Sequence, residues 1–396
     1  MWYRFCSDTK IRIKCLDRFE DFDCCIEEWI ICIVLLDFAQ TSEIIEFMKG
    51  DVPSRKKVPY KISDEFMGYL KKYGRQHTLP LQYEDLNRFI SSVPLVDLKG
   101  EDTLWETVYY TESDTIELHE ALRRIYAILK TEGDYSVMEH LVISRIDYCT
   151  FGNTRPFRVR IINKINDNYD HFYIKTADAS RAYGLELEHI LSPNRITYLV
   201  DGNTLIEEHI AGIPGDDFMK NYTDISAFNK IRIAKEFVKF NERCFIRLLG
   251  DMRSYNYVVD ITPDIEGNQY RIRAIDFDQQ SYEGRKSFYL PQYFKENNPI
   301  IFMGMEHMEM KTVRQYQTEE RSLIAVRTKS STVQLKNLFK NMIRDRISYP
   351  EKVSQLREEL AYHHKTDIFN YCDNMGEIVL TNLKLLLSRE FHGISW

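Results

Sequence analysis

No long hydrophobic run occurs in this sequence. The longest, from Trp29 to Leu36, falls far short of the roughly 20 residues that a membrane-spanning helix requires. Acidic residues flank it at Glu27, Glu28 and Asp37, whereas a secretion signal carries a basic front end. We therefore expect neither a membrane span nor a secretion signal, and we expect a cytoplasmic protein.

An excess of positive charge is also missing. The chain has 53 Lys and Arg against 60 Asp and Glu, which gives a formal net charge of −7. Nucleic acids and anionic membranes both select basic surfaces. The charge balance therefore predicts no nucleic-acid partner and no membrane partner.

Cysteine pairs at C-x-x-C spacing are absent as well. Five of the eight cysteines lie within the first 32 residues, but no C-x-x-C pair occurs and the first histidine is His77. Zinc sites normally use such pairs or nearby histidines. Disulfides are rare in a reducing compartment. Buried free thiols are therefore favoured over a zinc site.

The first third of the chain has helical periodicity. Apolar residues recur at helical spacing in Asp64–Tyr73, Tyr83–Ile90 and Asp114–Lys130, and turn residues within residues 2–17 indicate a small hairpin. A chain of 396 residues is long enough for two or three domains. We predict a mainly helical domain over residues 1–135, which could bind a protein partner.

From about Met138 the pattern changes to short strands separated by turns. A helix over Ser180–Leu191 interrupts them, and the glycine- and proline-containing segment 211–217 is typical of a hinge. We expect a strand-rich lobe over residues 136–213 and a helical lobe over residues 214–396. The five predicted strands are His140–Tyr148, Phe157–Ile165, His171–Thr176, Arg195–Val200 and Thr204–Ile210.

Oxygen-bearing side chains gather around a second, smaller hairpin. A long predicted helix leads into Asp251, Asn256 follows five residues later, and the second strand of the hairpin ends at Asp276 and Asp278. This order places their side chains at one end of a small sheet. Carboxylate and amide oxygens are ligands that Mg²⁺ prefers, so the cluster predicts a site for magnesium and phosphate.

Two upstream features are compatible with a phosphate ligand. The loop between the first two predicted strands contains Gly152, and backbone N–H groups of such a loop can cover a phosphate; an ordinary hairpin turn is the alternative. Lys175 ends the third strand, just before a helix that carries Glu186 and Glu188. A lysine and a helix glutamate in this order can form a phosphate-binding ion pair.

Taken in order, these parts resemble the protein-kinase-like fold, and most closely its aminoglycoside phosphotransferase and choline kinase type. The resemblance covers roughly residues 138–290. It implies an α+β, bilobal protein with a five-stranded antiparallel N-lobe and a helical C-lobe, here preceded by the helical N-terminal domain. It also implies binding of ATP and Mg²⁺.

The resemblance assigns roles to individual residues. Asp251 corresponds to the catalytic aspartate that receives the proton of the acceptor hydroxyl. Asn256 and Asp276 correspond to the metal ligands, and Asp278 either assists them or caps the turn. For the nucleotide, the phosphate-binding lysine is Lys175, its helix partner is Glu186 or Glu188, the phosphate loop retains Gly152, and the strand end at Glu208 would seat the adenine.

The sequence also departs from the family pattern. Leu249 occupies the position of a histidine that organises the catalytic loop, and no Ala-Pro-Glu sequence follows Asp278. These departures favour transfer to a small-molecule hydroxyl over transfer to a protein. Two alternatives remain open: a pseudokinase or nucleotide-binding interaction module, and a nucleotidyltransferase on the same fold.

Overall fold

The computed structural model describes residues 57–388 except 98–99, 132, 151–153, 223–225 and 266. The described residues belong to one compact unit that begins at Lys56. The hairpin predicted within residues 2–17, the five cysteines of the first 32 residues and Gly152 lie outside the described residues. Of the remaining cysteines, Cys149, Cys244 and Cys372 are buried free thiols, as predicted for this residue type.

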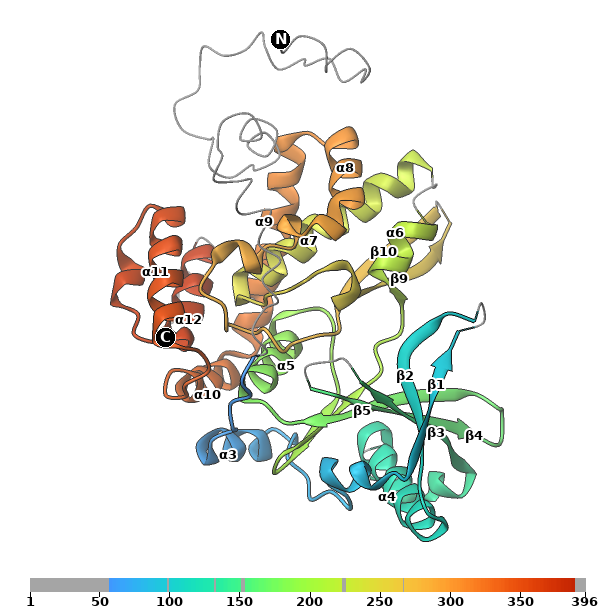
Figure 1. Cartoon of the computed structure of the whole chain (residues 1–396). Helices are drawn as coiled ribbons and strands as arrows, with labels where there is room; N and C mark the ends of the chain where they lie inside the picture. The colour runs from blue at the N-terminus through green and yellow to red at the C-terminus, as the bar shows by residue number, and fades with distance from the viewer. Residues whose placement is uncertain are drawn as a thin grey trace, which may run out of the picture. The chain divides into compact units, whose positions relative to one another are not determined.

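A seven-stranded antiparallel sheet forms the first part of this unit (Figure 1). Its strand order is β1-β2-β3-β4-β5-β7-β6, so the last two strands are exchanged relative to the sequence. Helix α5 (Ala179–Leu191) connects β5 to β6. The strands are β1 (Ser91–Val96), β2 (Asp102–Tyr109), β3 (Leu141–Cys149), β4 (Phe157–Asn163), β5 (Tyr169–Thr176), β6 (Tyr198–Asp201) and β7 (Thr204–Glu208).

Alternation of side chains gives the central strands two different faces. Val159 on β4 and Phe172 on β5 are fully buried against helix α4 (Glu112–Thr131). Arg158 lies on the opposite face of β4, paired in register with Tyr173 of β5. One face of the sheet is therefore a hydrophobic core, whereas the other carries polar and aromatic side chains.

The N-terminal third differs from the prediction. Two of its expected helices are present, as α3 (Asp64–Lys72) and α4, and Tyr83–Arg88 is a short 3₁₀ helix. However, β1 and β2 pair with each other and β2 pairs with β3, so this region extends the sheet from five strands to seven. No domain boundary at residue 136 is observed, because residues on both sides of it share one sheet and one core.

Helix α3 packs into the second, larger core rather than into a separate domain. The ring of Phe66 stacks on that of Tyr183 from α5, with 3.8 Å between ring centroids. Tyr69 and Leu70 are buried in the same cluster, which continues through the C-terminal helices. The α+β class is therefore correct, but the segment before residue 136 is an integral part of the fold.

The second part of the unit is mainly helical and contains one small sheet. Its strands are β8 (Ile213–Pro214), β9 (Tyr257–Asp264) and β10 (Gly267–Ala274), in the order β10-β9-β8. The helices are α6 (Gly215–Asn221), α7 (Ala227–Arg247), α8 (Asn298–His307), α9 (Met310–Ser330), α10 (Thr332–Met342), α11 (Pro350–His364) and α12 (Met375–Leu386). None of the described helices combines the length and apolarity that crossing a membrane requires.

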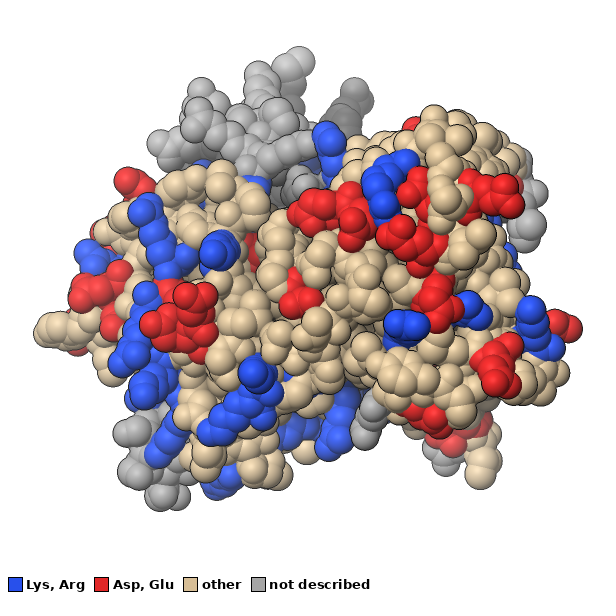
Figure 2. All heavy atoms as spheres, turned by 90° about the horizontal axis from the view of Figure 1, so that it is seen from below, with Lys and Arg blue, Asp and Glu red and all other residues tan. Residues whose placement is uncertain are grey.

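Charges are unevenly distributed on one face of the protein. Figure 2 shows more Lys and Arg toward the left of this face and more Asp and Glu toward the right, with both signs present on each side. The exposed lysines of α3 and α10 include Lys71, Lys72, Lys336 and Lys340. The net negative charge of the chain therefore coexists with a local basic region.

Candidate functional site

The loop after helix α7 is fixed by the segment that follows β10. The helix ends at Leu248, whose backbone is left-handed with φ of 54°. Gln280 donates hydrogen bonds from Nε2 to the carbonyl oxygens of Arg247 and Leu248. Leu249, at the position where the sequence resemblance leads us to expect a histidine, is fully buried in the hydrophobic core. Gln280 therefore supplies polar contacts to this loop while Leu249 contributes packing.

Asp251 is held in an unusual backbone conformation at the centre of this loop. Its φ is 59°, in the left-handed region that non-glycine residues rarely adopt. The N–H of Asp251 donates to the carbonyl of Phe288 at 3.1 Å. Arg253 donates from Nε to Oδ1 of Asp251 at 3.0 Å. Such strain persists only where surrounding contacts enforce it, and it is typical of functional sites.

Asn256 connects Asp251 to the strand end that carries Asp276. Its Nδ2 donates to the backbone carbonyl of Asp251 at 2.7 Å and lies 3.4 Å from Oδ2 of the same residue. Its own carbonyl accepts from the N–H of Ile275 at 3.0 Å. The structure therefore brings together Asp251, Asn256 and Asp276, as the sequence predicts.

A fully buried arginine joins the two terminal aspartates. Nη1 of Arg181, from the first turn of α5, donates to Oδ1 of Asp276 at 2.8 Å and to Oδ1 of Asp278 at 2.6 Å. Its Nε and Nη2 donate to the carboxylate of Glu207 on β7, with 2.8 Å between Nη2 and Oε2. One guanidinium thus links the sheet, helix α5 and the proposed metal ligands.

The predicted ion pair between Lys175 and Glu186 is wrong. Lys175 Nζ donates to Oε2 of Glu207 at 2.8 Å, because its side chain points across the sheet to the neighbouring strand. Glu186 instead accepts from Tyr69 Oη at 2.7 Å and from Arg75 Nε at 2.9 Å. It therefore anchors the N-terminal segment to α5.

The alternative helix partner, Glu188, is also not bonded to Lys175. It is buried and forms an ion pair with Arg247 at the end of α7. Both helix glutamates are thus used to attach α5 to its neighbours. Neither lies within bonding distance of the lysine on β5.

The position predicted to seat the adenine is occupied by a strand contact. The N–H of Glu208 donates to the carbonyl of Thr197 at 3.1 Å, and its Oε1 accepts from the N–H of Thr197 at 2.7 Å. Its Oε2 accepts from Lys130 of α4 at 3.1 Å. Glu208 is therefore engaged within the sheet, and the connection to β8 begins after it, at His209.

The acidic groups of the site differ in their tendency to ionise. Burial raises the pKa of Asp251 to about 6, against the opposing effect of Arg253. Burial of the carboxyl group and the negative charge of neighbouring Asp278 raise the pKa of Asp276. For Asp278, burial opposes ionisation but is outweighed by Arg181, Lys57 and Lys175, which lower its pKa.

The unpaired oxygen atoms of this cluster are of the kind that a magnesium ion binds. Among the described residues, no hydrogen bond reaches Oδ1 of Asn256 or Oδ2 of Asp276 and Asp278. All are hard oxygen donors of the kind Mg²⁺ binds together with several waters. The described part of the chain contains no group of three or more His, Cys, Asp or Glu arranged to hold a metal. A site here would therefore depend on the amide of Asn256 and on water.

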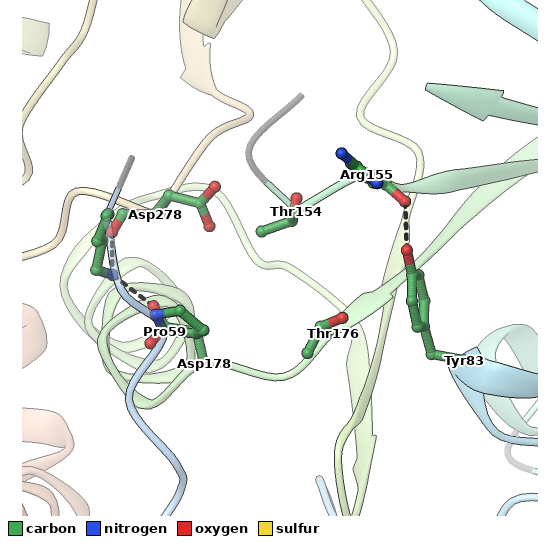
Figure 3. A pocket seen from close by; sticks show the side chains of 8 residues that line it. Pro59, Tyr83, Thr154, Arg155, Thr176, Asp178 and Asp278 are labelled. Atoms are coloured by element: carbon green, nitrogen blue, oxygen red, sulfur yellow. Dashed lines mark hydrogen bonds and ion pairs between the residues drawn. The ribbon is translucent and has the colours of Figure 1, made fainter. Parts of the chain in front are cut away.

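A cavity of about 180 Å³ opens beside Asp278. Figure 3 shows Asp178 and Asp278 on one side of it, Tyr83 and Arg155 on the other, and two threonines between them. Lys57 contributes from the segment that precedes α3. The lining residues are Lys57, Pro59, Tyr83, Thr154, Arg155, Thr176, Asp178 and Asp278.

Several residues of the site were not identified from the sequence. Arg181 lies in a helix whose glutamates alone match the family pattern, and Lys57 is remote in sequence from every motif. Nothing in the sequence singles out Glu207, because β7 ends in two adjacent glutamates, Glu207 and Glu208. Asp178 precedes α5 and caps it through the N–H of Arg181, a recognisable signal for a helix start.

No model of a known protein family matches the chain, and no curated protein is similar to it in sequence.

Proposed function

We propose that the protein is a Mg²⁺- and ATP-dependent phosphotransferase with a kinase-like arrangement of two lobes. The observation that carries the proposal is the connected set Asp251, Asn256 and Asp276 at the end of the small sheet. Phosphoryl transfer requires positioning and charge neutralisation more than covalent chemistry, and these residues supply both.

The topology of the larger sheet supports the same proposal. Strands β3, β4, β5, β7 and β6 are adjacent in that order, and α5 lies between β5 and β6 in sequence. This arrangement agrees with five antiparallel strands and a helix after the third, which the family resemblance implies. The short connection from His209 to β8 would then act as the hinge between two lobes.

Each residue has a role in the proposed reaction. Asp251 would orient the acceptor hydroxyl and take its proton as the oxygen attacks the γ-phosphorus of ATP, while the bond from that phosphorus to the β,γ-bridging oxygen breaks and ADP leaves. Asn256 and Asp276, assisted by Asp278, would hold Mg²⁺, which when bound would neutralise phosphate charge. Arg181 would fix the two carboxylates relative to the sheet. We propose a small-molecule hydroxyl as the acceptor, on the grounds of the departures from the protein-kinase pattern.

Titration of Asp251 gives the first prediction. A base with a pKa of about 6 is mostly protonated below that pH, so kcat/KM should rise as the pH increases through about 6. Arg253 lowers this pKa, so Arg253→Gln should move the midpoint to higher pH. A profile of kcat/KM against pH that is flat between pH 5 and 7 would remove Asp251 from the role of base.

Nucleotide binding is tested by thermal stability. If ATP with Mg²⁺ binds the folded protein, a concentration 100 times the Kd should add about 2.7 kcal/mol to the free energy of unfolding. The shift should require Mg²⁺ and should be lost in Asp276→Asn. No shift with the wild type at millimolar ATP and Mg²⁺ would contradict the proposal.

A second candidate function is a pseudokinase that acts as an interaction module. The favouring observation is that Arg181 already bonds one oxygen of both Asp276 and Asp278, and that Lys175 is paired with Glu207. In that case these buried ion pairs would stabilise the fold and would not bind a nucleotide. The thermal-shift experiment separates the two, since the module would remain unaffected by ATP and Mg²⁺.

A further inference from the structure

The cavity beside Asp278 has a lysine in its wall that no motif of the fold predicts. Lys57 Nζ donates to Oδ2 of Asp178 and to the backbone carbonyl of Asp278, at 2.5 Å each. An ammonium group has three N–H donors. These two contacts leave one of them for a ligand in the cavity that Lys57 lines.

Lys175, the lysine expected to hold phosphate, is placed differently. Its Nζ is bonded to Glu207 on the neighbouring strand, and it does not line this cavity. Glu207 is ionised down to low pH, because Arg181 and Lys175 outweigh the effect of burial and lower its pKa to about 2. Both lysines are thus paired with a carboxylate, Lys175 with Glu207 and Lys57 with Asp178, and the difference between them is that only Lys57 lines the cavity.

The remaining polar groups around the cavity are mainly donors. The hydroxyls of Thr154 and Thr176 and the guanidinium of Arg155 have no hydrogen-bond partner within the described part of the chain. Of the two carboxylates, Asp178 accepts from Lys57, from the N–H of Tyr60 and from the N–H of Arg181, whereas Asp278 keeps its Oδ2 without a hydrogen bond among the described residues. The unpaired donors of Thr154, Thr176 and Arg155 outnumber this one carboxylate oxygen, which favours an anion on the donor side of the cavity.

The size and position of the cavity fit a phosphate group. Its volume of about 180 Å³ is many times the roughly 10–15 Å³ that one water requires by the same kind of measure. Asp278 forms one wall and is linked through Arg181 to Asp276, so the cavity adjoins the proposed metal ligands. Thr154 and Arg155 lie in the loop between β3 and β4.

We infer that this cavity binds the terminal phosphates of the nucleotide and that Lys57, rather than Lys175, is the lysine that contacts them. The inference rests on the proposed function for the identity of the ligand, but phosphate binding can be measured without turnover. It makes the segment before α3 part of the ligand site.

The test is calorimetric titration of the full-length protein with Mg²⁺-pyrophosphate and with adenosine. Lys57→Met should weaken pyrophosphate binding about 10-fold or more, the loss expected for one hydrogen bond to a charged group. Arg155→Gln changes an exposed side chain of the same cavity and should weaken it in the same direction without a risk to folding. Adenosine binding should not respond to either change.

Lys61→Met is the matched control, since Lys61 is an exposed lysine in the same segment that does not line the cavity. It should leave pyrophosphate affinity unchanged. Wild-type protein that does not bind pyrophosphate would overturn the inference. So would a loss of binding in Lys175→Met together with unchanged binding in both Lys57→Met and Arg155→Gln.

Failure of the proposed phosphotransferase activity can be distinguished from failure of the phosphate cavity. Pyrophosphate binding that depends on Lys57 and Arg155, in a protein with no ATP turnover, would support the phosphate cavity and reject the phosphotransferase. Turnover of ATP that is insensitive to both substitutions would reject the cavity and support the phosphotransferase.

Discussion

Replacing Asp251 by Asn is expected to lower kcat for Mg²⁺-ATP turnover by about 10²–10⁴-fold, the usual contribution of a general base. The amide cannot accept the proton of the acceptor hydroxyl, but it keeps the size of the side chain and can still accept from Arg253 Nε. The backbone contact from Asn256 Nδ2 to the carbonyl of residue 251 does not involve the substituted group. ATP affinity should therefore change little.

The informative control for this substitution is Asp216→Asn. Asp216 is an aspartate in the first turn of α6, and it pairs only with Lys220 on the same helix within the described chain. Its loss should leave kcat unchanged. If Asp251→Asn retained wild-type kcat in a protein that still binds ATP, Asp251 would not be the base.

Replacing Arg181 by Met is expected to have the largest effect on stability. The side chain is 1% exposed and neutralises Glu207, Asp276 and Asp278 together. Removing one partner of a buried ion pair typically costs about 3–5 kcal/mol, since the remaining charges are left uncompensated. Urea denaturation should therefore show a free energy of unfolding lower by about that amount.

Acidification should reduce the difference in free energy of unfolding between the wild type and Arg181→Met. The lowered pKa of Glu207 stabilises the wild type above its ordinary pKa of 4.5, and this stabilisation is lost as the pH falls toward about 2. Arg181 is the main cause of the low pKa of Glu207. The variant without Arg181 therefore loses less folding free energy than the wild type as the pH falls from 4.5 toward about 2. The two proteins should become more alike in stability as the pH falls.

Arg88→Met is the matched surface control. Arg88 also pairs with two carboxylates, Asp114 and Glu117, but about 40% of its side chain is exposed. Exposed ion pairs contribute about 0–1 kcal/mol, so this variant should be close to the wild type. Arg181→Met with a loss no larger than that of Arg88→Met would show that the buried network is dispensable.

Local patterns in the sequence were sufficient to predict the elements around the site. The alternation of apolar and charged residues predicted β4, and the spacing of apolar residues predicted α7. The meeting of Asp251, Asn256 and Asp276 was also predictable, because a hairpin returns the chain to its starting point and places both of its ends together.

Contacts between distant segments were not predictable in the same way. Lys175 has Glu207 across the sheet and the two helix glutamates, Glu186 and Glu188, after it in sequence. Glu207 is its partner because strand β7 pairs with β5 in the sheet. Lys57 is separated from Asp278 by 221 residues, and no periodic pattern records that contact. Strands β1 and β2 were missed because their faces are only partly buried and lack a continuous apolar pattern.

The most direct test of the proposed activity uses two labelled forms of ATP. Wild-type protein and Asp276→Asn are incubated with Mg²⁺, a mixture of small hydroxyl metabolites, and ATP labelled at either the γ- or the α-phosphate. We predict that the γ-label appears on a metabolite with the wild type, that the α-label does not, and that Asp276→Asn transfers neither. Transfer of the α-label would indicate nucleotidyl transfer instead, and wild-type protein that transfers no label would contradict the proposed phosphotransferase.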